Sequence, residues 1–152
     1  MTVATFAVLA RRWRPGIFDT NILQGPDTVP DARDPSSFLP LNPPALHVLL
    51  VLGERRMHGY AMMEDLERRT GGAATLLPGT LYTTLARLVE QGLVREVPAP
   101  EYDRQGGARR YYARTALGRA VAGAESKRLD AIVRLAVDDG LISGGTMGEP
   151  PA

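Results

Sequence analysis

The sequence of 152 residues contains no cysteine and only two histidines, His47 and His58. The lack of cysteine excludes disulfide bonds, thiolate metal ligands and thiol nucleophiles. Two histidines without cysteine partners do not make a metal site, so we expect no metal and no cofactor. A Ser-His-Asp set, a carboxylate pair in an apolar setting and a phosphate-cradling glycine loop are also missing from the stretch expected to be ordered. These absences argue against an enzyme.

Long hydrophobic runs are missing as well. No segment approaches the roughly 18 to 20 apolar residues of a membrane-spanning helix. The apolar run from Val3 to Ala10 is short, and it precedes Arg11 and Arg12, whereas a secretory signal has its positive charge first. We therefore expect a cytoplasmic protein with no membrane partner.

Proline and glycine, with 12 and 16 residues, are concentrated at the two ends of the chain. Residues 1–38 lack sustained periodicity and predict a disordered or loosely attached N-terminal arm. The patterned region predicts a folded domain over residues 39–114 and a helix over residues 115–139. Residues 140–152 predict a flexible tail.

The stretch from Leu77 to Val94 is the most informative part of the sequence. Leu81, Leu85, Leu88 and Val89 have the spacing of the apolar stripe of a helix. A proline at the start and a glycine just past the end bound this helix at about residues 78–91. Its opposite face is small, hydroxylated and singly basic, with a tyrosine at the edge. That face consists of Gly79, Thr80, Thr83, Ala86, Arg87 and Glu90, with Tyr82 beside it.

Two shorter helices are predicted before this one. Asn42 is a plausible N-cap for a buried helix that ends near Leu52. A second helix runs to about Arg69, with Tyr60, Met63 and Leu66 recurring every three residues. His58, Gly59 and Tyr60 are expected to form the turn and core contact that set the angle between these two helices.

After Gly92 the period changes to two, and a second β-prone run follows a glycine-containing loop, which predicts a β-hairpin over about residues 94–114. Because Tyr111 and Tyr112 alternate in direction, one should lie in the core and the other should be exposed. The hairpin begins a stripe of arginines with no acidic residue among them, and such a stripe favours an anionic neighbour. The stripe comprises Arg104, Arg109, Arg110, Arg114 and Arg119.

Thr115 is expected to cap a last helix that ends near Asp138. One apolar face begins at Leu117 and Val121 and can cover the domain. A second apolar face, rotated around the helix, needs a partner, and a second copy of the chain is the economical choice. The second face consists of Leu129, Ile132, Val133 and Ala136.

The order of elements predicts a mainly α fold with a small β-hairpin, a winged helix-turn-helix domain followed by a C-terminal dimerisation helix. In such domains the third helix enters the major groove of double-stranded DNA and the hairpin, or wing, contacts the backbone. Tyr82 suits packing and phosphate contact equally well. The predicted DNA contacts are Gly79, Thr80, Tyr82, Thr83 and Arg87 from the helix, and Arg104, Arg109 and Arg110 from the wing. The alternative is a winged-helix module that binds another protein.

Several motifs in this order resemble the PadR family of transcriptional regulators. They are His58-Gly59-Tyr60, Gly79-Thr80-Leu81-Tyr82, Gly92-Leu93-Val94, Arg109-Arg110-Tyr111-Tyr112 and Thr115 with Gly118-Arg119. The resemblance implies a cytoplasmic homodimer, usually a repressor, that binds a palindromic operator and can release it when a small-molecule effector binds. This chain departs from the family's pattern in two places. Thr83 stands where the family often has proline, and the last helix lacks the tryptophan with which some members bind planar drugs.

Overall fold

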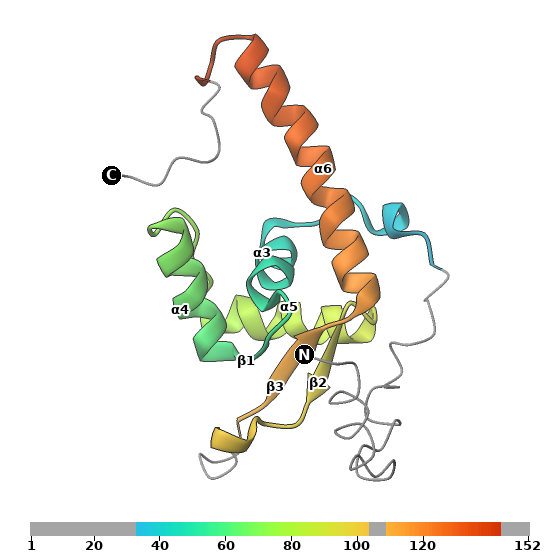
Figure 1. The fold of residues 1–152 in the computed structure, drawn as a ribbon, viewed down its shortest axis with the longest axis vertical. Helices are drawn as coiled ribbons and strands as arrows, with labels where there is room; N and C mark the ends of the chain where they lie inside the picture. The colour runs from blue at the N-terminus through green and yellow to red at the C-terminus, as the bar shows by residue number, and fades with distance from the viewer. Residues whose placement is uncertain (1–32, 104–108, 144–152) are drawn as a thin grey trace, which may run out of the picture. The chain divides into compact units, whose positions relative to one another are not determined.

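Figure 1 shows the fold in the computed structural model, which describes residues 33–103 and 109–143. These residues belong to the unit Ala32–Ala152; the other unit, Met1–Asp31, lies outside the described residues. The elements follow in the order η2 (Pro35–Phe38), α3 (Pro43–Leu52), β1 (Arg56–His58), α4 (Gly59–Thr70), α5 (Pro78–Glu90), β2 (Val94–Val97), η3 (Glu101–Asp103), β3 (Tyr111–Arg114) and α6 (Ala116–Asp138).

The described chain is mostly helical, with a small antiparallel sheet in the order β1-β3-β2. Helices α3, α4 and α5 enclose the core, β2 and β3 form the wing, and α6 leads away from it (Figure 1). This arrangement confirms the predicted winged helix-turn-helix fold.

The helix ends follow local chemistry that the sequence already contains. Asn42 accepts a hydrogen bond from the amide of Ala45 at 2.9 Å, and prolines occupy the first turn of α3. Thr115 accepts one from the amide of Gly118 at 3.0 Å and so starts α6. Gly92, with a φ of 75°, follows the end of α5 in the left-handed region that favours glycine. The predicted limits of these helices are confirmed.

Leu81, Leu85 and Leu88 are fully buried and fasten α5 to the core, as predicted. Val89 is different, because 39% of it is exposed. Thr84, which lies beside Leu88 on the helical wheel, on the side away from Val89, is buried instead. The buried face of α5 is therefore rotated slightly away from the predicted one.

The sheet differs from the predicted two-stranded hairpin. Arg56–His58, expected to be part of a turn, form a third strand that pairs with β3, with Met57 opposite Tyr112. Both Tyr111 and Tyr112 are buried, so the prediction that one would be exposed is wrong. Tyr112 joins the helical core, whereas the imidazole of His58 covers the ring of Tyr111 edge-on, with the ring centroids 5.4 Å apart.

Helix α4 buries a different face from the one that the spacing of its apolar residues suggests. Met62, Asp65 and Leu66 face inward, while Tyr60 is 60% exposed and is not a core contact. The Asp65 carboxylate is buried because Arg55 donates to it at 2.7 Å and Arg68 and Arg69 also pair with it. The arginines form a polar cap over this part of the helix.

Residues 33–38, the end of the predicted arm, contact the folded domain. Pro35–Phe38 form a 3-10 turn that lies beside α6 (Figure 1). Arg33 donates to the backbone carbonyl of Gln91 at 2.8 Å, and Phe38 packs partly buried against the core. The rest of the predicted arm, residues 1–32, lies outside the described residues.

Helix α6 has a buried first half and an exposed second half. Val121 and Ala122 join the core, and the buried carboxylate of Glu125 accepts two hydrogen bonds from Arg128 at 2.7 and 2.8 Å. The turns after Leu129 project beyond α3, α4 and α5 (Figure 1). In the part of the chain that the structure describes, no helix has both the length and the apolar character needed to cross a membrane.

Candidate nucleic-acid interface

The outer face of α5 is open along its whole length. Gly79, Thr80, Thr83 and Arg87 are all exposed, on the side opposite the three buried leucines. Within residues 33–103 and 109–143, no carboxylate pairs with the guanidinium of Arg87. The structure thus brings these predicted residues together on one exposed face, which carries Arg87 and also the carboxylate of Glu90.

Tyr82 lies at the edge of this face and packs against α4. Its ring is 52% exposed, yet a Cβ added to Gly59 would come within 2.8 Å of its hydroxyl. Residue 59 has to be glycine because the side chain of Tyr82 passes directly over it. Tyr82 joins α5 to the start of α4 and still presents a free edge of its ring.

A groove of about 800 Å³ separates α5 from the wing. Tyr82, Ala86 and Val89 line one wall, and the wing lines the other. The start of α4 contributes Tyr60, which its spacing with Met63 and Leu66 placed in the core. Its place in the first turn of α4 is the one feature of the sequence that indicates an exposed side chain. The wing wall consists of Glu96, Arg109, Arg110 and Tyr112.

The wing arginines are exposed but have carboxylates nearby. Arg109 lies 3.6 Å from Asp103, and Arg110 lies 3.9 Å from Glu96. The arginine side chains are 57% and 72% exposed, respectively, so both can reach solvent. Arg104, the third predicted wing contact, lies outside the described residues.

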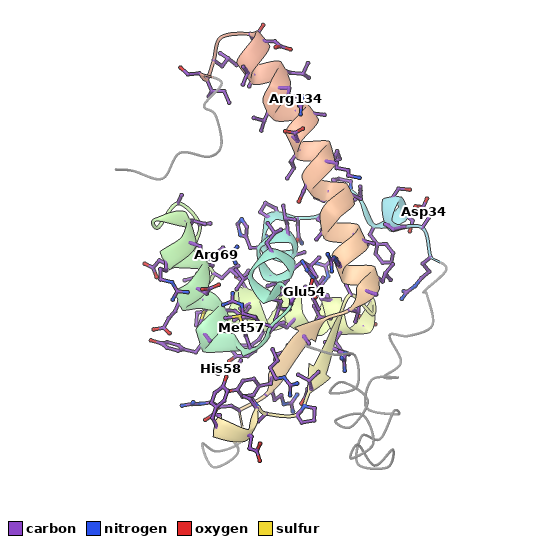
Figure 2. All side chains as sticks on the ribbon, viewed as in Figure 1. Asp34, Glu54, Met57, His58, Arg69 and Arg134 are labelled. Atoms are coloured by element: carbon purple, nitrogen blue, oxygen red, sulfur yellow. The ribbon has the colours of Figure 1, made fainter. Side chains whose placement is uncertain are left out.

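The two other arginines of the stripe have a structural role. Arg114 donates to the carbonyl of Leu49 at 3.1 Å and to Glu54 at 3.0 Å, and Arg119 donates to the same Glu54 at 3.1 Å. Figure 2 labels Glu54, which follows the end of α3. For this part of the stripe the anionic neighbour is Glu54, a carboxylate that the fold brings in from a distant part of the sequence.

The side chain of Asp103 is held in place by Tyr111. The hydroxyl of Tyr111 donates to its carboxylate, and this bond, followed by burial, raises the pKa of Tyr111 to about 12. The Asp103 side chain is only 17% exposed. Its carboxylate is therefore held within the wing, while the side chain of Arg109 beside it is 57% exposed.

His58 supports the start of α4. Its Nδ1 accepts a hydrogen bond from the amide of Ala61 at 3.2 Å, so the imidazole acts as the N-cap (Figure 2). The motif His58-Gly59-Tyr60 thus contributes a cap, a close approach for Tyr82 and an exposed ring in the groove. Among the described residues, no group of three or more histidine, aspartate or glutamate side chains is arranged to hold a metal ion.

The second half of α6 presents the apolar face predicted for dimerisation. Ile132 and Val133 are each 48% exposed, whereas Leu129 and Ala136 are half-buried. Leu135, which the sequence pattern places on the first apolar face with Leu117 and Val121, is exposed as well. Leu141 and Ile142, just past the end of the helix, are also exposed.

The sequence of the described domain matches one family of proteins. Residues 48–124 match the Transcriptional regulator PadR-like family. The chain belongs to this family, which confirms the resemblance in its motifs.

The chain is also similar to individual proteins, one in sequence and two in fold. The chain is 33% identical over 89 residues to Transcriptional regulator Rv3488 of Mycobacterium tuberculosis, covering 59% of this chain and 78% of that protein. A PadR family transcription regulator from Clostridium difficile has a similar fold, with a TM-score of 0.56 at 21% identity over 66% of this chain and 100% of that chain. A transcriptional regulator from Clostridium thermocellum has a TM-score of 0.52 at 21% identity over 62% of this chain and 89% of that chain.

Proposed function

We propose that this protein is a homodimeric, sequence-specific DNA-binding repressor. The outer face of α5 reads base edges in the major groove of an operator, and the wing holds the adjacent backbone. The observation that carries the proposal is the exposed polar face of α5 beside the wing groove. Threonine hydroxyls can bond base edges, and Arg87 suits a phosphate or a guanine edge.

Charge supports the backbone part of the proposal. Arg109 and Arg110 extend from the wing and border the groove on the side opposite Tyr82. Cations on such a wing neutralise phosphates and release counterions, which makes affinity depend steeply on salt. We include Arg104 in this set because it stands between β2 and β3 in the sequence.

The exposed apolar end of α6 supports a homodimer. Side chains such as Ile132 and Leu135 lose their contact with water when a second copy of α6 covers them. A two-fold dimer would present two copies of α5, which fits a palindromic operator in double-stranded DNA. Such a regulator works where the DNA is, and the compartment that we propose is the cytoplasm.

We also propose that a small-molecule effector relieves repression, as the family resemblance implies. α6 has no aromatic side chain between Ala116 and Asp138. A planar effector stacked on a tryptophan of this helix is therefore not part of the proposal.

The experiment measures binding of the purified protein to fragments of its own promoter region and to unrelated duplexes of equal length. We expect tighter binding to one promoter fragment, weakening steeply as salt rises from about 50 to 200 mM. Replacing Arg109 and Arg110 by alanine should lower affinity on all fragments and reduce the salt slope by about one per residue. Lys127→Ala, which removes a cation of α6 away from the wing, is the matched control and should leave both unchanged.

The alternative is a winged-helix module that binds another protein. Glu90 on the outer face of α5 and Glu96 on the wing favour it, since carboxylates repel DNA. Equal binding to every duplex, or no binding in low salt, would support this alternative and contradict the repressor.

A further inference from the structure

The two wing arginines that border the groove are each matched with a carboxylate of the wing itself. Arg109 lies 3.6 Å from Asp103, and Arg110 lies 3.9 Å from Glu96. Both distances exceed those of a charge-assisted hydrogen bond, which are about 2.7 to 2.9 Å. These are loose pairs at the surface, and an arginine can leave such a pair without a large free-energy cost.

The pairs differ from the other arginine pairs of the same stripe. Arg114 is 12% exposed and is bonded both to Glu54 and to a backbone carbonyl, so it is fixed in the fold. Arg109 and Arg110 have side chains more than half exposed. The wing therefore keeps its cations exposed to solvent and places a carboxylate close to each.

The carboxylates themselves cannot both move away. The Tyr111 hydroxyl bonds to Asp103, which is only 17% exposed. Glu96 lies on β2 opposite Tyr112 in the sheet register, so backbone pairing sets the position of its main chain, while its side chain is 52% exposed and can reorient. When a phosphate takes Arg109, the negative charge of Asp103 stays beside it; when a phosphate takes Arg110, the negative charge of Glu96 remains on the neighbouring strand of the wing.

We propose that Asp103 and Glu96 act as an electrostatic brake on DNA binding by the wing. A phosphate must displace each carboxylate from its arginine and then remain near that carboxylate, so the wing alone holds DNA weakly. Stable binding then requires the contacts that α5 makes with base edges. This inference rests on the proposed DNA-binding function and adds two residues that limit affinity for DNA of any sequence.

The test compares Asp103→Asn and Glu96→Gln with wild type on a fixed random-sequence duplex, so no operator has to be known. Asp103→Asn retains one side-chain oxygen, which can still accept a hydrogen bond from the Tyr111 hydroxyl. The substitution therefore changes the charge of the side chain more than its shape. We expect each substitution to raise affinity up to about fivefold, the effect of one exposed ion pair. The gain should shrink at higher salt because exposed charges are screened.

The matched control is Asp130→Asn. Asp130 is also an exposed carboxylate paired with an arginine, at 2.9 Å from Arg134. Figure 2 shows Arg134 on the projecting part of α6, away from the wing. The control substitution changes the net charge of the chain by the same amount. Equal gains from Asp130→Asn and the wing substitutions would overturn the brake, because net charge alone would then explain them.

The remaining outcomes also decide the question. Weaker binding by the wing variants would overturn the brake and show that the carboxylates position the arginines. If wild type binds DNA and the variants bind equally well, the brake is wrong and the proposed function stands. If wild type and the double variant Asp103→Asn/Glu96→Gln both fail to bind in low salt, the proposed function fails as well. Binding by the double variant alone would support the brake.

Discussion

Gly118, in the first turn of α6, lies directly against the backbone carbonyl of Leu93. A Cβ at residue 118 would overlap that oxygen, which also accepts a hydrogen bond from the amide of Thr115 at 3.1 Å. The Thr115 hydroxyl adds a bond to the carbonyl of Gly92 at 2.7 Å. These contacts join the start of α6 to the end of α5, so the helix proposed to read DNA and the helix proposed to dimerise are coupled through backbone.

Replacing Gly118 by alanine should therefore lower the free energy of unfolding by about 1 to 3 kcal/mol, because the clash is with backbone that cannot rotate away. Gly123→Ala is the control within the same helix, since nothing lies within 4 Å of its added Cβ. It should raise stability by about 0.5 to 1 kcal/mol through helix propensity. Urea denaturation measures both, and equal effects at the two sites would contradict the packing.

The buried carboxylate of Asp65 predicts a loss of stability in acid. Burial would raise the pKa of Asp65, but the hydrogen bond and charge of Arg55, with Arg68 and Arg69, hold it below its usual value of 3.8. A lowered folded-state pKa gives stability that is present above the unfolded pKa and lost as pH falls through the folded pKa. Wild type should lose more stability than Asp65→Asn as pH falls below about 4.

The measurement is urea denaturation at neutral pH and at several values below pH 4. Asp130→Asn is the control, since Asp130 is 59% exposed. If wild type and Asp65→Asn lose stability in parallel, the ion pairs around Asp65 do not contribute to stability in this way.

Thr83 is the residue that should separate sequence reading from general DNA affinity. It is exposed on the outer face of α5, and it stands where the family often has proline. If its hydroxyl bonds a base edge, Thr83→Ala should weaken operator binding by about 1 kcal/mol and leave binding to random duplex unchanged. Fluorescence anisotropy on both duplexes measures the difference. An equal loss of affinity on both would indicate that Thr83 contacts the DNA backbone instead of a base edge.

The exposed apolar end of α6 predicts a dimer that dissociates when one charged side chain is introduced into this surface. Ile132→Glu places a carboxylate in the middle of the face at a residue that is already 48% exposed, so the monomer should remain folded. Sedimentation should show monomer for this variant and dimer for wild type. Lys127→Glu, on the same helix outside that face, should stay dimeric; a dimeric Ile132→Glu protein would place the interface elsewhere.

Local sequence determined most of the elements. The helix ends are set by Asn42, by Thr115 and by the interval from Pro78 to Gly92. Local sequence can set them because a capping bond, or a glycine in the left-handed conformation, involves only neighbours within a few residues. The leucine spacing of α5 determined which face is buried, and therefore which face is presented. Both the fold class and the family were predictable from these local patterns.

Only the tertiary structure decided the features that join distant segments. β1 exists because β3 offers a free edge more than fifty residues later in the chain, at a register pairing Met57 with Tyr112. Glu54 meets Arg114 and Arg119, and Glu96 meets Arg110, although nothing in the local sequence links them. Periodicity reports which face of an element is apolar, but the charge left on a surface depends on which side chains the fold brings together.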